Sequence, residues 1–531
     1  MQPAIALALG TALVHFAAVI LIDRVRRYRA LAALSRKHRC APAQRELPWD
    51  LLGLYKVWSA AKHVIAGDSL KDAERLFASY GQTYASCILG QRVFFTCHPR
   101  NMRQVLVSRF QDFDSSKGIR DHLFRPITAR GIFALDGEDW KAARGLFRDL
   151  FSHTRTLFDI ELQERCFQNL LVRLEHEERT SGKAMDLQPR FLDLMLDLTT
   201  AFAMGESSDV LRLDQSAEKK EFVAALLYVK KTMARDGFLG PVHVFLSKKE
   251  FHRCCGTVHR FVERVIRERL ESKSQLEKSQ KSTPDGGDAS EHKNHGCLLD
   301  GLMESSTNVL ELRDGVVTIL IAGIDSVASL LSTTFFLIAR DQRVFDKLRE
   351  SILTSIGHEQ PTYESLRNLG YLRHVFNETM RVYPPVPFNA RTANTDTVLA
   401  VGGGPHGDAP VLVKKGERVV FSSWGSHRSL QNFGDDAHEF RPERWDKLQA
   451  ETLGFIPFNQ GPRACPGRGW VQTEHYALME ASYATVRLLQ IFSSVKPRDE
   501  KGWRENLGLN LSNLNGTVVE LVRDPAAPAA G

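Results

Sequence analysis

Apolar residues recur at helical spacing along several long stretches of this chain. The pattern covers residues 155–178, 222–233, 256–271 and 312–339. Such spacing predicts helices with a buried face, and the last is long enough to cross a large domain as one helix. Alternating or β-branched segments are short and local, at residues 83–89, 93–97, 397–401, 411–413 and 418–421. The pattern predicts a mainly α fold with small antiparallel β-sheets.

The first residues form a separate apolar segment. Residues 4–22 are apolar apart from Thr11 and His15, and Arg24, Arg26 and Arg27 follow directly. This length is sufficient to cross a bilayer, and the positive charge favours keeping the following side in the cytoplasm. No small-residue cleavage site follows the run. We therefore expect residues 1–22 to be a single-pass transmembrane signal anchor with the remaining chain in the cytosol.

The composition of the remaining chain indicates a linker, one large domain with an insertion, and a short tail. Residues 23–50 form a basic stretch that we interpret as a linker, and residues 51–523 show no second compositional break and no repeat. Residues 272–295 are rich in Ser, Lys, Gln, Gly and Asp, which predicts a mobile surface insertion. The Pro/Ala-rich residues 524–531 are expected to form a disordered tail.

Overall composition excludes several classes of protein. Hydrophobic residues make up 43% and charged residues 25% of the chain, with a net charge of +7, which is ordinary for a globular protein. No basic run with interleaved aromatic residues indicates a nucleic-acid groove. The eight cysteines are scattered without repeated C-x-x-C pairs. This spacing favours a reducing compartment over a disulfide framework or a zinc ribbon.

One cysteine lies in a distinctive loop, Phe458-Asn-Gln-Gly461-Pro-Arg463-Ala-Cys465-Pro-Gly467. Glycines on both sides of Cys465 allow backbone amides to approach its sulfur, and Arg463 supplies a nearby cation. Residues 470–488 have helical character, so the cysteine would lie near a helix N-terminus, which favours a thiolate. The alternative is a turn that contains a buried free cysteine.

This loop resembles the haem-binding signature of the cytochrome P450 superfamily at all five fixed positions. The resemblance implies that Cys465 is the axial thiolate ligand of haem b, iron protoporphyrin IX. It also assigns Phe458, Gly461, Arg463 and Gly467 to cofactor binding. It extends over essentially all of residues 50–520 and implies the cytochrome P450 fold, preceded here by the transmembrane helix.

Other segments fit the same family. Trp140 and Arg144 lie one helical turn apart, and the resemblance assigns both to the haem propionates, together with Arg391. Without the other motifs, the first pair is equally typical of an ordinary amphipathic helix.

A carboxylate and a guanidinium, Glu378 and Arg381, share one helix face. Alone this spacing is a common surface pair. In the family such a pair is joined by the arginine of a P-E-R-F-like segment to form a buried charged triad. Arg444 matches that arginine, and Trp445 stands where Phe is commoner.

The sequence Ala322-Gly323-Ile-Asp325-Ser326 lies within the longest predicted helix. It resembles the oxygen-activation motif A-G-x-D-T, in which an acid and a hydroxyl deliver protons. We expect Asp325 and Ser326 to be catalytic, although Ser326 replaces the usual threonine and its rotamer is less constrained. The alternative is that Ser326 bonds only to the carbonyl of Ala322.

A further motif is misleading. Gly402-Gly-Gly404-Pro-His-Gly407 satisfies G-x-G-x-x-G after a predicted strand. A dinucleotide site requires a helix next, whereas another strand follows. We predict a glycine-rich hairpin.

The family implies a monooxygenase that inserts one oxygen atom from O2 into a C–H bond. Electrons would come from NADPH through NADPH-cytochrome P450 reductase at the endoplasmic reticulum membrane. Several segments resemble the fungal branch that hydroxylates n-alkanes and fatty acids: residues 131–137, 388–397, 402–404, 413–416 and 440–445. A long-chain lipophilic substrate follows: a fatty acid, an alkane or a polyketide-like product of secondary metabolism. The alternatives are a reductase-independent isomerase or dehydratase of a hydroperoxide, and a non-enzymatic haem sensor.

Overall fold

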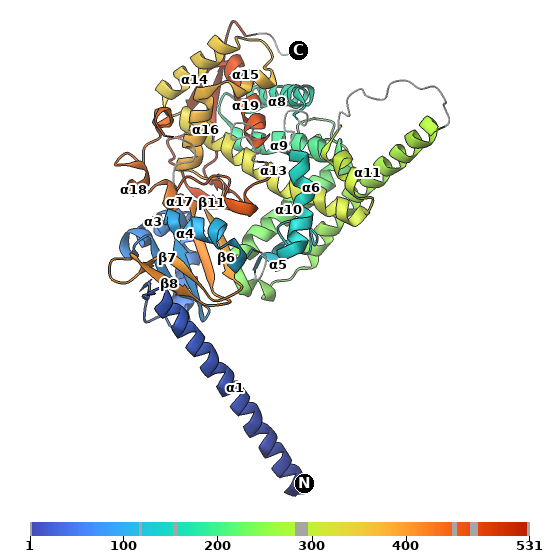
Figure 1. Cartoon of the computed structure of the whole chain (residues 1–531). Helices are drawn as coiled ribbons and strands as arrows, with labels where there is room; N and C mark the ends of the chain where they lie inside the picture. The colour runs from blue at the N-terminus through green and yellow to red at the C-terminus, as the bar shows by residue number, and fades with distance from the viewer. Residues whose placement is uncertain are drawn as a thin grey trace. The chain divides into compact units, whose positions relative to one another are not determined.

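The protein is described by a computed structural model of the chain (Figure 1). The structure describes residues 3–115, 119–151, 158–281, 296–448, 454–467 and 476–527. The chain forms two compact units. The first comprises Met1–Ala60, Ala73–Asp114 and Ala390–Ser422, and the second comprises Ala61–Asp72, Ser115–Asn389 and Ser423–Gly531.

A six-stranded sheet dominates the first unit, with strand order β1-β2-β3-β9-β6-β4. Its strands are β1 Gln44–Arg45, β2 Thr83–Ile88, β3 Gln91–Thr96, β9 Arg418–Ser422, β6 Phe388–Ala393 and β4 Phe113–Asp114. The strands predicted near β2, β3 and β9 are confirmed. The sheet is mixed, however, because β1–β2 and β3–β9 pair in parallel. Alternation predicts that a strand exists but does not identify a partner distant in sequence.

The glycine-rich segment joins strands β7 (Thr397–Gly403) and β8 (Ala409–Val413), which pair antiparallel. The amide of Gly402 donates to the Gly407 carbonyl at 2.8 Å. Gly402 has φ +116°, and an added Cβ would lie 2.4 Å from Thr83 Cγ2. The next regular element is the strand β9, so the predicted hairpin is confirmed and the dinucleotide interpretation is excluded.

The second unit is mainly helical and is built around α13 (Val309–Ile338), which contacts α9 (Leu187–Met204), α11 (Lys249–Lys281), α16 (Gly370–Val382) and α19 (Tyr476–Ile491). By length and composition α13 could span a membrane, but 72% of its apolar window is buried inside the protein. It is therefore a core helix. Two small sheets accompany it, β10 (Phe492–Pro497)-β13 (Val518–Arg523)-β5 (Met185–Asp186) and β11 (Glu505–Leu507)-β12 (Leu511–Asn513).

The predicted long helices are present. Residues 155–178 correspond to α8 (Ile160–Ser181) within the described residues, 222–233 to α10 (Ala217–Leu239), 256–271 to α11 and 312–339 to α13. Polar side chains begin three of them, since Asp159, Ser216 and Asn308 accept hydrogen bonds from first-turn amides. The remaining helices are α2 Leu54–Ala66, α3 Ser69–Tyr80, α4 Pro99–Arg103, α5 Ile119–Phe124, α6 Gly137–Phe151, α12 Leu298–Ser305, α14 Gln342–Ser355, α15 Tyr363–Arg367, α17 Ser423–His427 and α18 Leu430–Phe433.

Three sequence-based boundaries are wrong. Residues 23–37, predicted as linker, continue helix α1 (Pro3–Lys37), and residues 272–281, predicted as part of a loop, continue α11. Both stretches are rich in Arg, Lys, Glu, Gln, Ala or Leu, which extend an existing helix without needing buried surface. Asp524, predicted to begin the tail, donates its amide to Ile491 O and pairs with Arg349. Residues 282–295 and 528–531 lie outside the described part of the chain.

Candidate functional site

The cysteine loop is a tight backbone turn in the second unit. The 3₁₀ turn η5 spans Gly461–Arg463, and Gly461 takes a left-handed φ of 73°. The Cys465 amide donates to the Phe458 carbonyl at 2.9 Å, which fixes the cysteine opposite the start of the loop. A Cβ added at Gly467 would lie 3.7 Å from Cys465 Sγ. Gly467 therefore lies directly beside the sulfur, at ordinary van der Waals distance. Residues 468–475, where the predicted following helix begins, are not described.

The environment of Cys465 differs from that of the buried cysteines. Burial raises the pKa of Cys97, Cys166, Cys255 and Cys297 to about 12, so these thiols stay protonated at neutral pH. Cys465 is half-buried, and Arg144 lies within electrostatic range. Burial lowers the pKa of Arg144, and the charge of Cys465 opposes that change. A guanidinium next to the sulfur stabilises the thiolate.

Helix α6 brings two further predicted residues to this loop. Arg144 donates to the Ala464 carbonyl. The guanidinium of Arg463 lies 4.3 Å from the centre of the Trp140 ring. The same guanidinium donates to the Leu135 carbonyl at 2.8 Å. The structure therefore groups Trp140, Arg144, Arg463 and Cys465.

An aspartate and an arginine that the sequence did not indicate belong to the same cluster. Asp136 pairs with Arg463 at 2.5 Å and accepts the Ser115 amide at 2.8 Å. Arg120, on α5, is half-buried and donates to Asn389 Oδ1 at 2.9 Å. Burial lowers the pKa of Arg120, whereas the charge of Asp136 raises it. No motif marks either residue, and their partners are distant in sequence.

Arg391 lies in the first unit, within β6. It is buried, donates to the Ala390 carbonyl at 2.8 Å and lies 5.6 Å from the centre of the Phe421 ring. Both of these partners belong to the first unit.

The motif from Ala322 to Ser326 interrupts the run of buried residues along the continuous helix α13. Ala322, Gly323 and Ser326 are only half-buried, although most neighbouring residues are fully buried. The Ser326 hydroxyl donates to the Ala322 carbonyl at 2.8 Å, the bond that the alternative interpretation expects. A Cβ added at Gly323 would lie 3.2 Å from Thr199 Cγ2. Close packing against α9 thus gives this glycine a structural role as well.

Asp325 has an ion-pair partner that sequence reasoning missed. Lys230, on α10, places its Nζ 2.7 Å from Asp325 Oδ1, and their side chains are 5% and 24% exposed. Burial lowers the pKa of Lys230, and Asp325 raises it. The only sequence signal is that Lys230 follows Leu226 and Val229 on a buried helix face. Because Lys231 is adjacent, the two consecutive lysines look like part of an ordinary solvated helix surface.

The predicted charged triad is assembled between α16 and the 3₁₀ turn η4 (Pro442–Asp446). Glu378 receives two bonds from Arg381, at 2.8 and 2.9 Å, and one from Arg444 at 2.8 Å. Trp445 Nε1 adds a bond at 3.0 Å that a phenylalanine could not make. All three charged side chains are buried.

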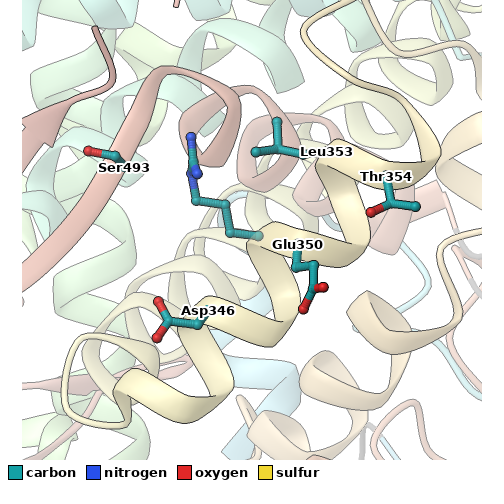
Figure 2. A pocket seen from close by; sticks show the side chains of 6 residues that line it. Asp346, Glu350, Leu353, Thr354 and Ser493 are labelled. Atoms are coloured by element: carbon teal, nitrogen blue, oxygen red, sulfur yellow. The ribbon is translucent and has the colours of Figure 1, made fainter. Parts of the chain in front are cut away.

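A separate surface hollow lies between α14 and β10. Figure 2 shows Asp346, Glu350, Leu353 and Thr354 projecting from α14, with Ser493 on the neighbouring strand. Its lining includes none of the predicted site residues, and we assign it no role in the chemistry.

Comparison with known proteins agrees with this arrangement. The family model described as Cytochrome P450 matches residues 54–515. Similar curated proteins include the cytochrome P450 monooxygenase fsdH of Fusarium heterosporum, 33% identical over 98% of this chain and 90% of the relative. The cytochrome P450 monooxygenase himC of Aspergillus japonicus is 34% identical over 94% and 88%. Cytochrome P450 52A1 of Candida tropicalis is 34% identical over 82% and 79%.

The match spans most of the chain and includes both the cysteine loop and the charged triad. Members of the matched family bind haem through a cysteine thiolate, and the relatives are named as monooxygenases. The chain therefore belongs to the cytochrome P450 family and is a haem-thiolate monooxygenase.

Proposed function

We propose that this enzyme inserts one oxygen atom from O2 into a C–H bond of a long-chain lipophilic substrate, with electrons from NADPH through a membrane-bound reductase. The observation that carries this proposal is the half-buried Cys465 beside Arg144 in a glycine-bounded loop. When bound, haem supplies the activation of oxygen, and the thiolate ligand favours O–O cleavage.

The residues present fit that cofactor. Cys465 would supply the axial sulfur, and Phe458, Gly461 and Gly467 would shape the loop around it. Cationic guanidinium groups cluster beside the sulfur. Such donors suit the two propionate carboxylates on one edge of the haem ring. We assign Arg144 and Arg463 to the propionates, with Trp140 as an additional donor. For Arg391, which lies in the first unit, the same assignment rests on the family resemblance alone. Arg120 adds a further cation to the cluster with Asp136.

Asp325 and Ser326 are proposed to deliver protons. In this structure the acid is held by Lys230, and the hydroxyl is turned to its own helix. Proton transfer would require Asp325 to exchange its lysine for water and Ser326 to change rotamer. Asp325 retains partial exposure, which makes the first change accessible. The retained acid and hydroxyl favour reductase-dependent oxygenation over hydroperoxide isomerisation or a sensor role.

A fatty acid or an alkane is the proposed substrate class, with a polyketide-like metabolite as an alternative. The support is the resemblance of residues 388–397 and 440–445 to the fungal hydroxylase branch.

We further propose that α1 anchors the enzyme in the endoplasmic reticulum membrane with the catalytic part in the cytosol. Leu13, Val14, Phe16 and Leu21 on this helix are exposed. Apolar side chains in this number favour a lipid environment.

The test uses the full chain in membranes that contain the reductase. Fatty acids and alkanes are screened for changes in the haem spin state, and NADPH use, O2 use and product are then measured together. We expect a spin-state change with long chains and product formation that requires NADPH. Conversion of a lipid hydroperoxide without NADPH, with no oxygenation of any bound chain, would contradict the proposal.

A further inference from the structure

Helix α13 has one accessible face near its centre. Ala322, Gly323, Asp325 and Ser326 are half-buried, whereas the positions between and beside them are buried. At about 100° per residue, these four residues lie within about 160° of the helix circumference. The two residues proposed to deliver protons therefore share this face with Gly323.

Two hydroxyl groups flank Gly323. From within the helix, Ser326 Oγ donates to the Ala322 carbonyl at 2.8 Å and lies 3.4 Å from the Gly323 carbonyl. From α9, Thr199 packs against the same glycine: a Cβ added at Gly323 would lie 3.2 Å from Thr199 Cγ2 and 3.6 Å from Thr199 Oγ1. A larger residue at position 323 would push this threonine away.

The Thr199 hydroxyl is placed unlike other buried hydroxyls of these helices. Thr200 donates to the Leu196 carbonyl at 2.7 Å, and Thr318 donates to the Asp314 carbonyl at 2.6 Å. Thr199 is 3% exposed, and its Oγ1 has no hydrogen-bond partner among the described residues. A buried hydroxyl without a partner is costly, and an ordered water molecule is its usual partner.

The position of Thr199 distinguishes it from a second hydroxyl of this kind. Thr485 Oγ1, on α19, is also buried and has no partner within the described part of the chain. Residues 478–491 around it are all buried. Thr199 lies instead against the accessible face of α13. A bound water needs room and at least two polar partners, which the Thr199 hydroxyl and the Gly323 carbonyl can supply.

We propose that Thr199 is a positioning residue for proton delivery, with its hydroxyl holding a water molecule against Gly323. The inference rests on the proposed role of Asp325 and Ser326. Ser326 can deliver a proton only when its hydroxyl leaves the Ala322 carbonyl. The water held by Thr199 offers that hydroxyl a new partner and so lowers the cost of the rotamer change. A serine needs this partner more than a threonine would, because its rotamer is less constrained. Thr199 keeps its own proton throughout.

The test compares variants of the full haem-loaded enzyme, assayed with its reductase. Thr199→Val keeps the packing against Gly323 and removes the hydroxyl, Thr199→Ser retains the hydroxyl, and Thr485→Val is the matched control. We expect Thr199→Val to release about two- to tenfold more peroxide per NADPH consumed, because a positioning residue contributes less than a catalytic acid, which is worth roughly 100-fold or more. The other two variants should keep the wild-type ratio.

Denaturant unfolding gives a second readout that does not depend on turnover. Replacing a hydroxyl that has no partner by a methyl group leaves the unfolding midpoint unchanged or raises it, whereas removing a hydroxyl that holds a water lowers it. The midpoint should therefore fall in Thr199→Val and not in Thr485→Val. Equal shifts of the midpoint in these two variants would overturn the proposed water site.

Two other results would also overturn the inference. A lower midpoint in Thr199→Val with an unchanged peroxide ratio would make the water purely structural. A raised ratio in Thr199→Ser would assign the effect to packing of the lost methyl group.

Ser326→Ala separates this inference from the proposed function. If Ser326→Ala raises the peroxide ratio and Thr199→Val does not, the role of Thr199 fails and the proposed proton delivery stands. If neither variant raises the ratio, both proposals fail.

Discussion

Two buried ionic sites in this enzyme are built in opposite ways. Glu378 receives hydrogen bonds from Arg381, Arg444 and Trp445. Its carboxylate therefore has little capacity left to accept further hydrogen bonds. Asp325 receives one bond from Lys230 and remains partly exposed. Burial disfavours any change of charge or partner at the first site, whereas the second can exchange its lysine for water. The comparison distinguishes a fully enclosed charge cluster from the partly exposed carboxylate to which we assign proton delivery.

The largest expected effect is at Glu378. Glu378→Gln leaves the buried guanidinium of Arg381 without its carboxylate partner and leaves Arg444 with Asp436 alone. The free energy of unfolding should fall by about 3–5 kcal/mol. Denaturant unfolding measures it. The control is Glu138→Ala, which removes an exposed partner of Lys141 and should cost less than about 1 kcal/mol. Equal effects of the two changes would contradict the assignment.

The stability of the protein should depend on pH through His427, which lies next to the Glu378 cluster. Burial lowers the pKa of this histidine to about 3, and its Nε2 accepts the Ile456 amide at 2.9 Å, so the folded state needs the neutral ring. The unfolded chain binds a proton below about pH 6.5. Stability should therefore fall, by about 1.4 kcal/mol per pH unit, as the pH decreases from 6.5 toward 3.

His427→Gln removes the titrating group and retains a hydrogen-bonding side chain. Its stability should depend less on pH than that of the wild type over this window. Identical pH slopes in the two proteins would exclude His427 as the cause.

At the second site, Lys230→Met should lower stability by only about 1–2 kcal/mol, because the remaining carboxylate reaches solvent. The main effect should be on proton delivery, seen as more peroxide released per NADPH consumed. Lys230→Arg retains the charge and should restore the ratio toward that of the wild type. A methionine variant that is destabilised like Glu378→Gln, with unchanged peroxide release, would show that the two sites do not differ.

The smallest effect is expected from Trp445→Phe. The change introduces the commoner residue of the family but removes the bond from Nε1 to Glu378. A loss of about 1 kcal/mol in unfolding free energy is expected, since both arginines remain. A neutral result would mean that this bond contributes nothing once the cluster is otherwise complete.

Sequence reasoning predicted the elements that depend on local pattern. Helix α13, the β7–β8 hairpin and the loop around Cys465 each have a continuous signature. The interactions of Lys230, Arg120 and Asp136 could not be predicted in this way. Their partners are distant in the chain, and a lysine or arginine that will be buried has the same local pattern as one on a solvated face. The helical extension to residue 281 was missed because low apolar content was interpreted as absence of structure.

The central claim is that Cys465 is the thiolate ligand of the haem iron. The most direct test is the carbon monoxide difference spectrum of the reduced protein, compared with Cys465→Ser and with Cys40→Ser, a change at another half-buried cysteine. We predict a thiolate-type band in the wild type and in Cys40→Ser, and its loss in Cys465→Ser. An unchanged band in Cys465→Ser, or an imidazole-type band in the wild type, would contradict the account.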